Sequence, residues 1–423
     1  MVRIVKMLLF ENKEQKLINT LKFVGSPFKK FVSTGEIKED IGLVQSRQEF
    51  LEDLINVIER NENFILPIIG SVGQGKTHLY WALKHELYKY NIVYISLETV
   101  YKKFYYNTYA EFIQNLGEKP EERVEPIRNM TRRLCHDWDE GEKKFGFFQI
   151  ADIEEVKKKA LRIWSKKVED KDALKDVITA ITAHQCDPYK KVEAERWLLG
   201  DLMDVRDLSR LNLKYDLRKT NIAFTMLKVL IENLKKKSVL FIDDFEKIIS
   251  IKTPIYETTE EIEEIEEVFD PSWFGTKQTP ENYTSEKVLD KILDLQKIRG
   301  LRIIITLKSI DYLEEIKRKI ENKNRKLLLM IKEPIFMSDF IEQDVFQFYK
   351  NNLDFFFASI NYNDYFKHFS TSFFPLNKFV LEYIFKEAKG NPREVIKCLI
   401  KIFNEIVTSN EDLENILEKY LKE

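Results

Sequence analysis

The chain has 423 residues, enough for roughly two or three domains with their own hydrophobic cores. Charged residues make up 33% of it and nearly balance, with a formal net charge of -2, which argues against a protein whose whole surface attracts nucleic acid. Three scattered cysteines do not make a disulfide framework, and no apolar run reaches membrane-spanning length. We therefore expect a cytoplasmic protein without a membrane segment.

The opening MVRIVKMLLFENKEQ has a short apolar patch followed at once by charges, which predicts an ordinary strand or helix start and not a signal peptide. The patterns that follow predict an α/β fold, with a parallel sheet, a large helical insertion and a C-terminal helical lid. The expected parts are an N-terminal arm and linker (1–60), a first part of the core (61–100), the helical insertion (101–235), a second part of the core (236–335) with an acidic insert (252–285), and the lid (336–423).

A glycine-rich loop lies between a predicted strand, NFILPIIG from Asn63 to Gly70, and a predicted helix, THLYWALKHELYKY. Its spacing is G-x-x-x-x-G-K-T, which in this context is typical of a phosphate-binding loop. The alternative, a glycine-rich turn without a ligand, does not explain strand, loop and helix together. Lys76 would bridge the β- and γ-phosphates of a nucleotide, and the Thr77 hydroxyl would bind Mg²⁺. The residues expected around the phosphates are Gly70, Ser71, Val72, Gly73, Gln74, Gly75, Lys76, Thr77 and His78.

An acidic strand supplies the metal partner that such a loop needs. In KKKSVLFIDDFEKI, four apolar residues precede Asp243 and Asp244. Asp243 would bind Mg²⁺ directly or through water, and Asp244 would polarise the attacking water. Because Asp is one methylene shorter than Glu, Glu246 is the alternative base. A buried strand that ends in a solvated acidic turn is the alternative reading.

Two later segments indicate which class of nucleotide-binding protein the chain resembles. GLRIIITLKSIDYL predicts a strand with polar residues at its end, and KEAKGNPREVIKCLIKIF places Arg393 at a helix start. In this order the segments resemble those of AAA+ ATPases, within the branch of initiator-type and STAND ATPases. The resemblance implies that Thr306 is the sensor-1 residue and that Arg393 reaches the γ-phosphate from the lid. In STAND proteins a basic residue two places after such a Thr touches the γ-phosphate, which here is Lys308. A solvated strand end and an ordinary surface arginine remain the alternatives for these two cations.

The same resemblance implies two further sites. EDIGLVQSRQEFLEDLINVIER is similar to the linker that flanks the adenine in this branch, so Ile41, Gly42 and Val44 are the candidates for lining the base. AAA+ rings complete each site with an arginine from the neighbouring subunit, just before the fifth core strand. We expect that strand at KLLLMIKEPI, with Arg325 directly before it and Arg318 as second choice. A solvated basic helix end is the competing interpretation.

Within the insertion, AERWLLGDLMDVRDLSRLNL resembles a W-L-x-G helix in P-loop ATPases of BREX-type phage-exclusion systems, which also share GKTH and a strand L-x-x-x-x-T. Trp197 and Leu198 could equally be helix-core residues.

Cys135-His136 and His184-x-Cys186 could together bind one zinc ion, but helix packing is favoured because adjacent ligands fit one metal poorly. The acidic run 257–270 predicts an extended insert, either a solvated loop or a partner-facing element anchored by Trp273 and Phe274.

These observations predict a Mg²⁺-dependent ATPase that binds ATP and ADP. It would couple its nucleotide state to assembly or remodelling of a protein–nucleic-acid complex, with genome defence as the expected setting. The expected partners are other proteins that contact the insertion 101–235, nucleic acid as an indirect partner, and further copies of the chain in a homo-oligomer. Two alternatives stay open: a STAND-like switch with slow hydrolysis, and a protein that binds nucleotide only structurally.

Overall fold

The computed structural model describes residues 2–28, 44–100, 102–138, 153–250, 285–323, 325–361 and 373–421, without the side chains of residues 2–12, 250 and 285. The adenine-lining candidates Ile41 and Gly42 lie outside the described residues, as do nearly all of the acidic insert and its anchors Trp273 and Phe274. The chain divides into two compact units. The first comprises Met1–Arg60, Ile68–Glu86 and Ile335–Glu423, and the second Asn61–Pro67 and Leu87–Pro334.

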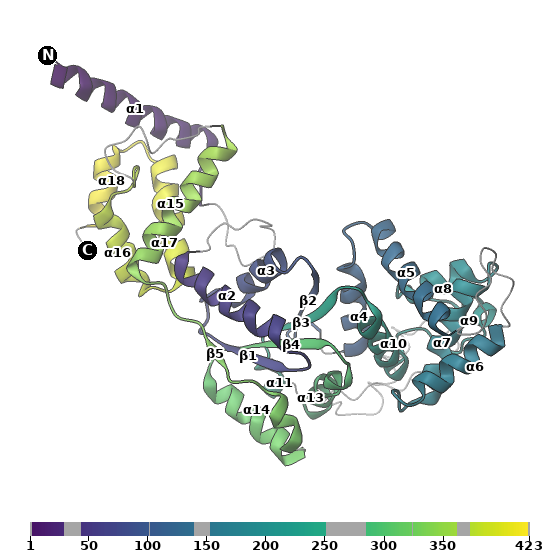
Figure 1. Cartoon of the computed structure of the whole chain (residues 1–423). Helices are drawn as coiled ribbons and strands as arrows, with labels where there is room; N and C mark the ends of the chain where they lie inside the picture. The colour runs from purple at the N-terminus through teal and green to yellow at the C-terminus, as the bar shows by residue number, and fades with distance from the viewer. Residues whose placement is uncertain are drawn as a thin grey trace, which may run out of the picture. The chain divides into compact units, whose positions relative to one another are not determined.

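The fold is mixed α/β with a five-stranded parallel sheet (Figure 1). The strand order is β2-β3-β4-β1-β5. Helices cover such a sheet on both faces, which explains why its strands are nearly continuous apolar runs. The strands predicted before Gly70, at the acidic segment and at GLRIIITL are confirmed with shifted ends, as β1, β3 and β4. The bounds are β1 (Ile65–Ile69), β2 (Tyr90–Ser96), β3 (Lys237–Asp243), β4 (Leu301–Leu307) and β5 (Ile335–Phe336).

The predicted fifth strand over KLLLMIKEPI is wrong for most of its length. Arg325–Met330 forms the 3₁₀ helix η4, and only an isolated bridge at Ile331 and the two residues of β5 pair with β1. A run of leucines carries no alternation that separates strand from helix. In addition, Pro334 has no N–H to donate to a neighbouring strand. Arg325 therefore opens a helical turn and does not directly precede a strand.

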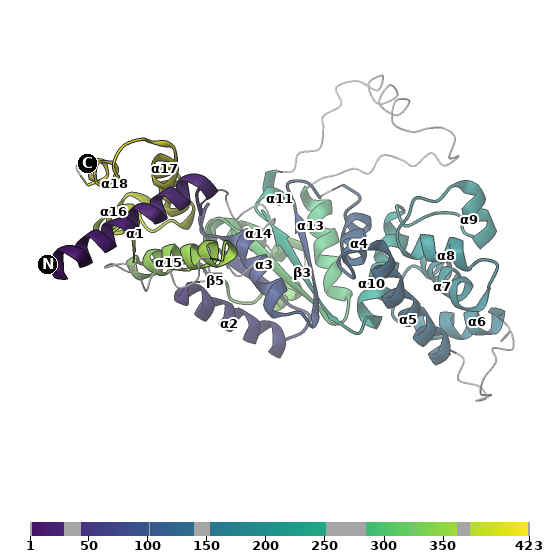
Figure 2. The same ribbon diagram turned by 90° about the horizontal axis from the view of Figure 1, so that it is seen from above.

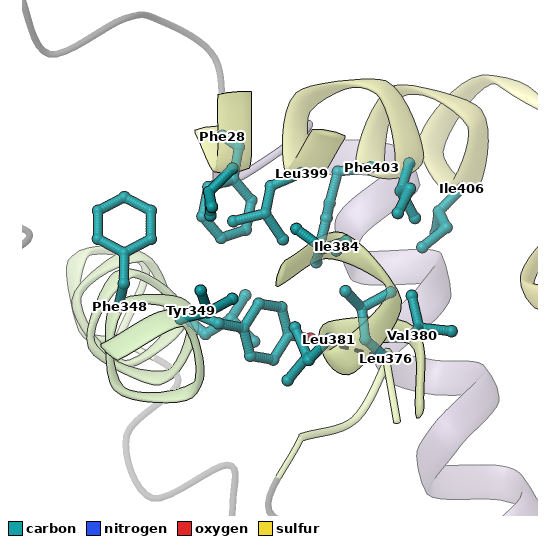
Figure 3. Packing of buried hydrophobic residues seen from close by; sticks show 14 of the residues in the cluster. Phe28, Phe348, Tyr349, Leu376, Val380, Leu381, Ile384, Leu399, Phe403 and Ile406 are labelled. Atoms are coloured by element: carbon teal, nitrogen blue, oxygen red, sulfur yellow. Dashed lines mark hydrogen bonds between the residues drawn. The ribbon is translucent and has the colours of Figure 1, made fainter. Parts of the chain in front are cut away.

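The first unit holds the glycine-rich loop 70–75 and the C-terminal helices. Its core forms where α15, α16 and α17 converge, and Figure 3 shows Tyr349, Ile384 and Leu399 among the side chains that meet there. The ring of Phe28 stacks on Tyr349 at 6.1 Å, and α1 lies against α17 in the same unit. The opening segment is thus a helix that packs on the C-terminal helices. The helices are α1 (Val2–Val24), α2 (Gln45–Arg60), α3 (Lys76–Glu86), α15 (Glu342–Ser359), α16 (Lys378–Ala388), α17 (Pro392–Thr408) and α18 (Leu413–Lys419).

The second unit holds β2, β3 and β4 and the long segment between β2 and β3, which in its described residues consists of helices joined by turns and short connections. Figures 1 and 2 show these helices beyond α4, which packs against β2. They are α4 (Phe104–Gln114), α5 (Pro120–Trp138), α6 (Ile153–Trp164), α7 (Lys171–Cys186), α8 (Lys191–Leu198), α9 (Val205–Leu211) and α10 (Thr220–Asn233). After β3 follow α11 (Lys247–Ser250), α13 (Ser285–Asp294), η3 (Leu295–Lys297) and α14 (Ile310–Lys323).

Residues singled out in the insertion are part of its packing. Trp197 is fully buried in α8, and its indole N–H donates to the carbonyl oxygen of Tyr215 at 3.2 Å. His184 lies between Thr131 and Glu195, which it contacts at 2.9 and 3.2 Å. Within the described part of the chain, no group of three or more His, Cys, Asp or Glu side chains is arranged to bind a metal ion. None of the described helices has the length and apolar character that crossing a membrane requires.

Candidate functional site

The glycine-rich loop expected to bind phosphate joins the end of β1 to the start of α3, and Lys76 is the first residue of that helix. The Lys76 ammonium donates to two carbonyl oxygens of the loop, that of Gly70 at 2.5 Å and that of Ser71 at 3.1 Å. The loop therefore curls around the lysine side chain. Since the first N–H groups of a helix have no partner within it, a cation beside that helix start makes a site suited to an anion.

Two loop glycines have backbone angles that side chains rarely adopt, with φ of +90° at Gly73 and +96° at Gly75. At Gly73 a Cβ atom would also lie 2.5 Å from Oδ1 of Asn391 and 2.8 Å from Cβ of Arg393. Glycine at this position is thus required twice, by the turn and by the close approach of α17.

Gln74 braces the loop from inside. Its side chain is buried, and Oε1 accepts the Ser71 backbone N–H at 2.7 Å. Its Nε2 donates to Oδ1 of Asp339 at 3.0 Å, which ties the loop to the segment after β5. Val72 is exposed at the tip, whereas Thr77 and His78 are partly exposed in the first turn of α3. Gln74, which occupies one of the x positions of the motif, thus stabilises the loop conformation alongside the glycines.

The start of α17 contacts the loop directly. Asn391 caps the helix, because its Oδ1 accepts the N–H groups of Arg393 and Glu394, and its Nδ2 donates to the carbonyl oxygen of Val72 at 3.0 Å. The Arg393 N–H also approaches the carbonyl oxygen of Gly73 at 3.2 Å. Sequence placed Arg393 at a helix start, and that helix start lies on the phosphate loop.

In the second unit, Asp243 ends β3 and is buried. The Thr306 hydroxyl donates to its Oδ1, the Tyr94 hydroxyl donates to its Oδ2 at 3.0 Å, and the Asp244 N–H donates to Oδ1 at 3.1 Å. Three donors aimed at one carboxylate hold it in a single orientation as an acceptor. Thr306, the sensor-1 candidate, thus contacts the metal-binding candidate.

Asp244 follows in a left-handed conformation, with φ of +53°, which Asp tolerates better than most residues. Its Oδ2 accepts a hydrogen bond from the Ser96 hydroxyl at 3.0 Å. Burial raises the pKa of the Asp244 carboxyl, and the negative charge of Asp243 raises that pKa further, against the opposing effect of the Ser96 hydrogen bond. The carboxylate is oriented by Ser96 at the end of β2.

Glu246, the alternative base, and Lys308, the basic residue two places after Thr306, form an ion pair. The Lys308 ammonium lies 2.9 Å from Oε1 of Glu246, whose side chain is buried. This hydrogen bond is the main reason that the pKa of Lys308 is raised. In this arrangement the ammonium and the carboxylate neutralise each other.

Two remaining candidates lie elsewhere. Val44 is fully buried and belongs to the hydrophobic cluster of the first unit, together with Phe340 and Tyr349. The Arg325 side chain is 85% exposed at the start of η4, with its Nε 3.6 Å from a carboxylate oxygen of Glu321.

Sequence reasoning missed four partners of the site: Tyr94, Ser96, Asp339 and the side chain of Asn391. A usable signal existed for the first two, because Tyr94 and Ser96 are polar residues two positions apart near the carboxyl end of an otherwise apolar strand, and so share one face. Asp339 lies in an irregular segment between β5 and α15, where no periodic pattern marks it.

No protein-family model matches the chain, and a search of curated proteins finds no similar sequence.

Proposed function

We propose that this chain is a Mg²⁺-dependent ATP-binding protein and ATPase of the AAA+ type, in the initiator/STAND-like branch. The observation that carries the proposal is the loop from Gly70 to Thr77, which follows a strand of a parallel sheet, curls around the Lys76 ammonium and leads into a helix start. Asp243 ends another strand of the same sheet. In open α/β sheets ligands bind outside the carboxyl ends of the strands; the loop follows the end of β1, and Asp243 is the last residue of β3.

The loop residues fit the phosphates of a nucleotide. Lys76 would exchange its contacts with the Gly70 and Ser71 carbonyl oxygens for phosphate oxygens, a stronger, charge-assisted contact. The Ser71 N–H, now bonded to Gln74, would become a phosphate donor once the glutamine side chain turns away. The partly exposed Thr77 hydroxyl would bind the metal.

Asp243 fits a metal partner because Mg²⁺ takes one or two carboxylates, phosphate oxygens and water. When bound, Mg²⁺ and ATP supply the γ-phosphoryl group and the charge that stabilises its transfer. Asp244, oriented by Ser96, would accept a hydrogen bond from the attacking water. Lys308 and Arg393 would face the γ-phosphate, with Lys308 first leaving Glu246.

Coupling of nucleotide state to partners is supported by the contact between α17 and the loop. A phosphate group that enters the loop must alter the backbone groups that Asn391 and Arg393 bind, and so bias the lid helices. The insertion helices α4–α10 are our candidate for the surface that recognises other proteins in a protein–nucleic-acid complex.

A second candidate function is a STAND-like switch that hydrolyses ATP slowly. The observation that favours it is that α17 already rests on the phosphate loop through two hydrogen bonds, those to Val72 and Gly73. A lid helix held at the loop would slow nucleotide exchange. A switch should then purify with tightly bound ADP, whereas a motor should exchange freely and respond to its substrate.

The test is a binding and hydrolysis assay with wild type, Lys76→Ala and, as a lysine control on the same helix, Lys84→Ala. We expect Lys76→Ala to weaken ATP binding in Mg²⁺ by about 10- to 150-fold, the worth of a charged hydrogen bond, and Lys84→Ala to bind like wild type. ATP turnover is measured with and without single- and double-stranded DNA. Undiminished ATP affinity in Lys76→Ala would falsify the phosphate-loop assignment.

A further inference from the structure

The amino ends of three neighbouring strands in the second unit carry a row of cations. Tyr90 of β2 pairs with Lys237 of β3, and Ser238 pairs with Leu301 of β4, so the residues before these pairs are neighbours as well. Adjacent strands lie about 4.8 Å apart. We call the exposed residues at these strand starts the basic edge: Lys89, Lys235, Lys236, Lys237 and Arg299.

The carboxylates near the basic edge are engaged with other cations. Glu232 pairs with Lys228 at 2.9 Å, and Asp294 and Glu169 both pair with Lys297, at 3.0 and 3.8 Å. Within the described part of the chain, no carboxylate side chain forms an ion pair with a member of the basic edge. Glu232 also accepts the Arg299 backbone N–H at 3.2 Å, so one carboxylate lies beside the row, but among the described residues the five side-chain cations form no ion pair of their own.

An exposed aromatic ring lies in the same row. Tyr88 is 68% exposed, and the Lys89 ammonium lies 5.5 Å from its ring centroid. The neighbouring Tyr90 is buried between Lys237 and Arg302, at 5.7 and 5.5 Å from its ring centroid. One tyrosine thus supports the basic edge, and the other presents its ring to solvent. Arg133 of α5 extends the positive region, since it donates to the carbonyl oxygen of Asn233 just before β3.

We propose that the basic edge and Tyr88 bind single-stranded nucleic acid. A row of unpaired cations suits a chain of phosphates, and an exposed ring beside it suits the face of an unpaired base. A duplex keeps its bases stacked and would not use Tyr88, and an acidic protein segment would need the cations but not the ring. The site lies at the amino ends of the strands, so it goes beyond the proposed nucleotide site at their carboxyl ends and does not depend on it.

The test measures fluorescence anisotropy of a labelled 20-nucleotide oligo-dT with the full chain, without nucleotide, from 50 to 300 mM salt. The test variant is Lys235→Glu/Lys236→Glu/Arg299→Glu. The control is Lys158→Glu/Arg162→Glu/Lys166→Glu, which reverses the same residue types at exposed positions of α6 and of the turn that follows it in the same unit. We expect the test variant to bind at least about tenfold more weakly at 50 mM salt. Because each cation contributes about 0.7 to the slope of log K against log salt, that slope should fall by about 2. The control should bind like wild type, and both should melt as wild type does.

Tyr88→Ala separates stacking from charge. We expect about fivefold or more loss of oligo-dT affinity with an unchanged salt slope. Four results would overturn the proposal: no binding of oligo-dT by wild type at 50 mM salt, equal losses in test and control variants, unchanged affinity in Tyr88→Ala, or equal binding of a 20-base-pair duplex. Competition by poly-glutamate as effective as that by unlabelled oligo-dT of equal charge would instead assign the surface to acidic protein.

Discussion

At the residue scale, the two adjacent aspartates after β3 have different surroundings. Asp243 receives three hydrogen bonds, from Tyr94, Thr306 and the Asp244 backbone, and is buried. Asp244 receives one side-chain hydrogen bond, from Ser96, and is half-buried. An acceptor surrounded by donors is suited to a fixed charge, whereas a carboxylate with one donor keeps lone pairs for water. The geometry thus supports a division of labour between them.

Asp243→Asn should damage Mg²⁺-dependent nucleotide binding and lower stability. The amide keeps only one acceptor oxygen, so its NH₂ group replaces either the oxygen that accepts from Tyr94 or the one that accepts from Thr306 and the Asp244 N–H, and a donor left unpaired in this way costs about 1–3 kcal/mol. Calorimetric titration of ATP with Mg²⁺ or EDTA and thermal melting measure both effects. Wild-type Mg²⁺ dependence in this variant would remove Asp243 from the metal site.

Asp244→Asn should leave ATP binding intact and slow hydrolysis by roughly 10²-fold or more, since an amide cannot accept a proton. Its amide oxygen can still accept from Ser96, so the local geometry is kept. Ser96→Ala is the companion variant, in which the carboxylate remains but loses its orienting donor, and we expect a smaller rate loss. Single-turnover hydrolysis measures both. If Asp244→Asn hydrolyses ATP at the wild-type rate, Glu246 becomes the candidate base.

At the element scale, the cap of α17 serves two structures at once. The oxygen of the Asn391 side chain completes the helix, and its nitrogen donates to the phosphate loop at Val72. An N-cap side chain contributes about 0.5–2 kcal/mol to stability, and Asp is as good a cap as Asn. The two roles can therefore be separated by substitution.

Asn391→Asp should keep the cap and lose the donor to Val72, whereas Asn391→Ala should lose both. We expect Asn391→Ala to lower the unfolding free energy by about 1 kcal/mol and Asn391→Asp to change it much less. Both should accelerate release of bound ADP if the lid contact restrains the nucleotide. Stopped-flow release of a fluorescent ADP analogue gives the rate, and wild-type release by both variants would contradict the restraint.

A second element-scale contact joins three insertion helices. His184 of α7 lies between Thr131 of α5 and Glu195 of α8, and Glu195 also pairs with Arg128 at 2.8 Å. Burial lowers the pKa of His184, although the hydrogen bond to the Glu195 carboxylate acts in the opposite direction. The folded state therefore favours the neutral imidazole.

The insertion should lose stability in mild acid for this reason. The unfolded histidine takes up a proton near pH 6.5, above the pKa of folded His184, so this part of the stability is present above that pH and is lost below it. One proton gives at most about 1.4 kcal/mol per pH unit. Between pH 7.5 and 5.5 the melting temperature of His184→Gln should fall less than that of wild type.

His136→Gln is the control for that experiment, because the His136 side chain is 89% exposed. It should follow the wild-type pH dependence. Parallel melting curves of His184→Gln and wild type would mean that this histidine does not set the response to acid.

At the scale of the whole molecule, the chain has an α/β fold with one five-stranded sheet, a large helical segment between β2 and β3, and further helices after β5. The sequence proposal of a ring rests on an arginine that acts on a neighbouring copy. Arg325 opens η4 with its side chain 85% exposed, so its guanidinium is accessible from outside the chain. A planar guanidinium there could reach a γ-phosphate held by another copy.

Arg325→Ala should bind ATP normally yet hydrolyse it slowly, by up to about 10³-fold where such an arginine acts. Mixing it with Asp244→Asn should restore part of the activity, because some interfaces then pair an intact arginine with an intact aspartate. Arg318→Ala, exposed on α14, tests the second candidate in the same way. A mass measurement that finds a monomer with ATP, together with no rescue on mixing, would leave the solitary switch as the better description.

The local sequence pattern was sufficient to predict those features that depend only on residues close together in the chain. The strand before Gly70, the helix from Lys76 and the position of Asp243 at a strand end each follow from apolar runs and glycine spacing within about a dozen residues. The same reasoning failed at the expected fifth strand. A leucine run after Arg325 has no period that distinguishes strand from helix, and only pairing with β1 identifies Ile335–Phe336 as the strand.

The sequence by itself thus determined the strand, glycine-rich loop and helix around Lys76, the acidic strand and the helical start at Arg393, because each is a short-range pattern in the chain. Only the tertiary structure decided which polar groups meet. Thr306 contacts Asp243 across 63 positions, Ser96 contacts Asp244 across 148, and Asn391 contacts Val72 across 319. Local propensity carries no information about such pairs, since they form only when parallel strands and packed helices bring distant segments together. The basic edge has the same origin, because three separate strand starts become one row of charge only through the register of the sheet.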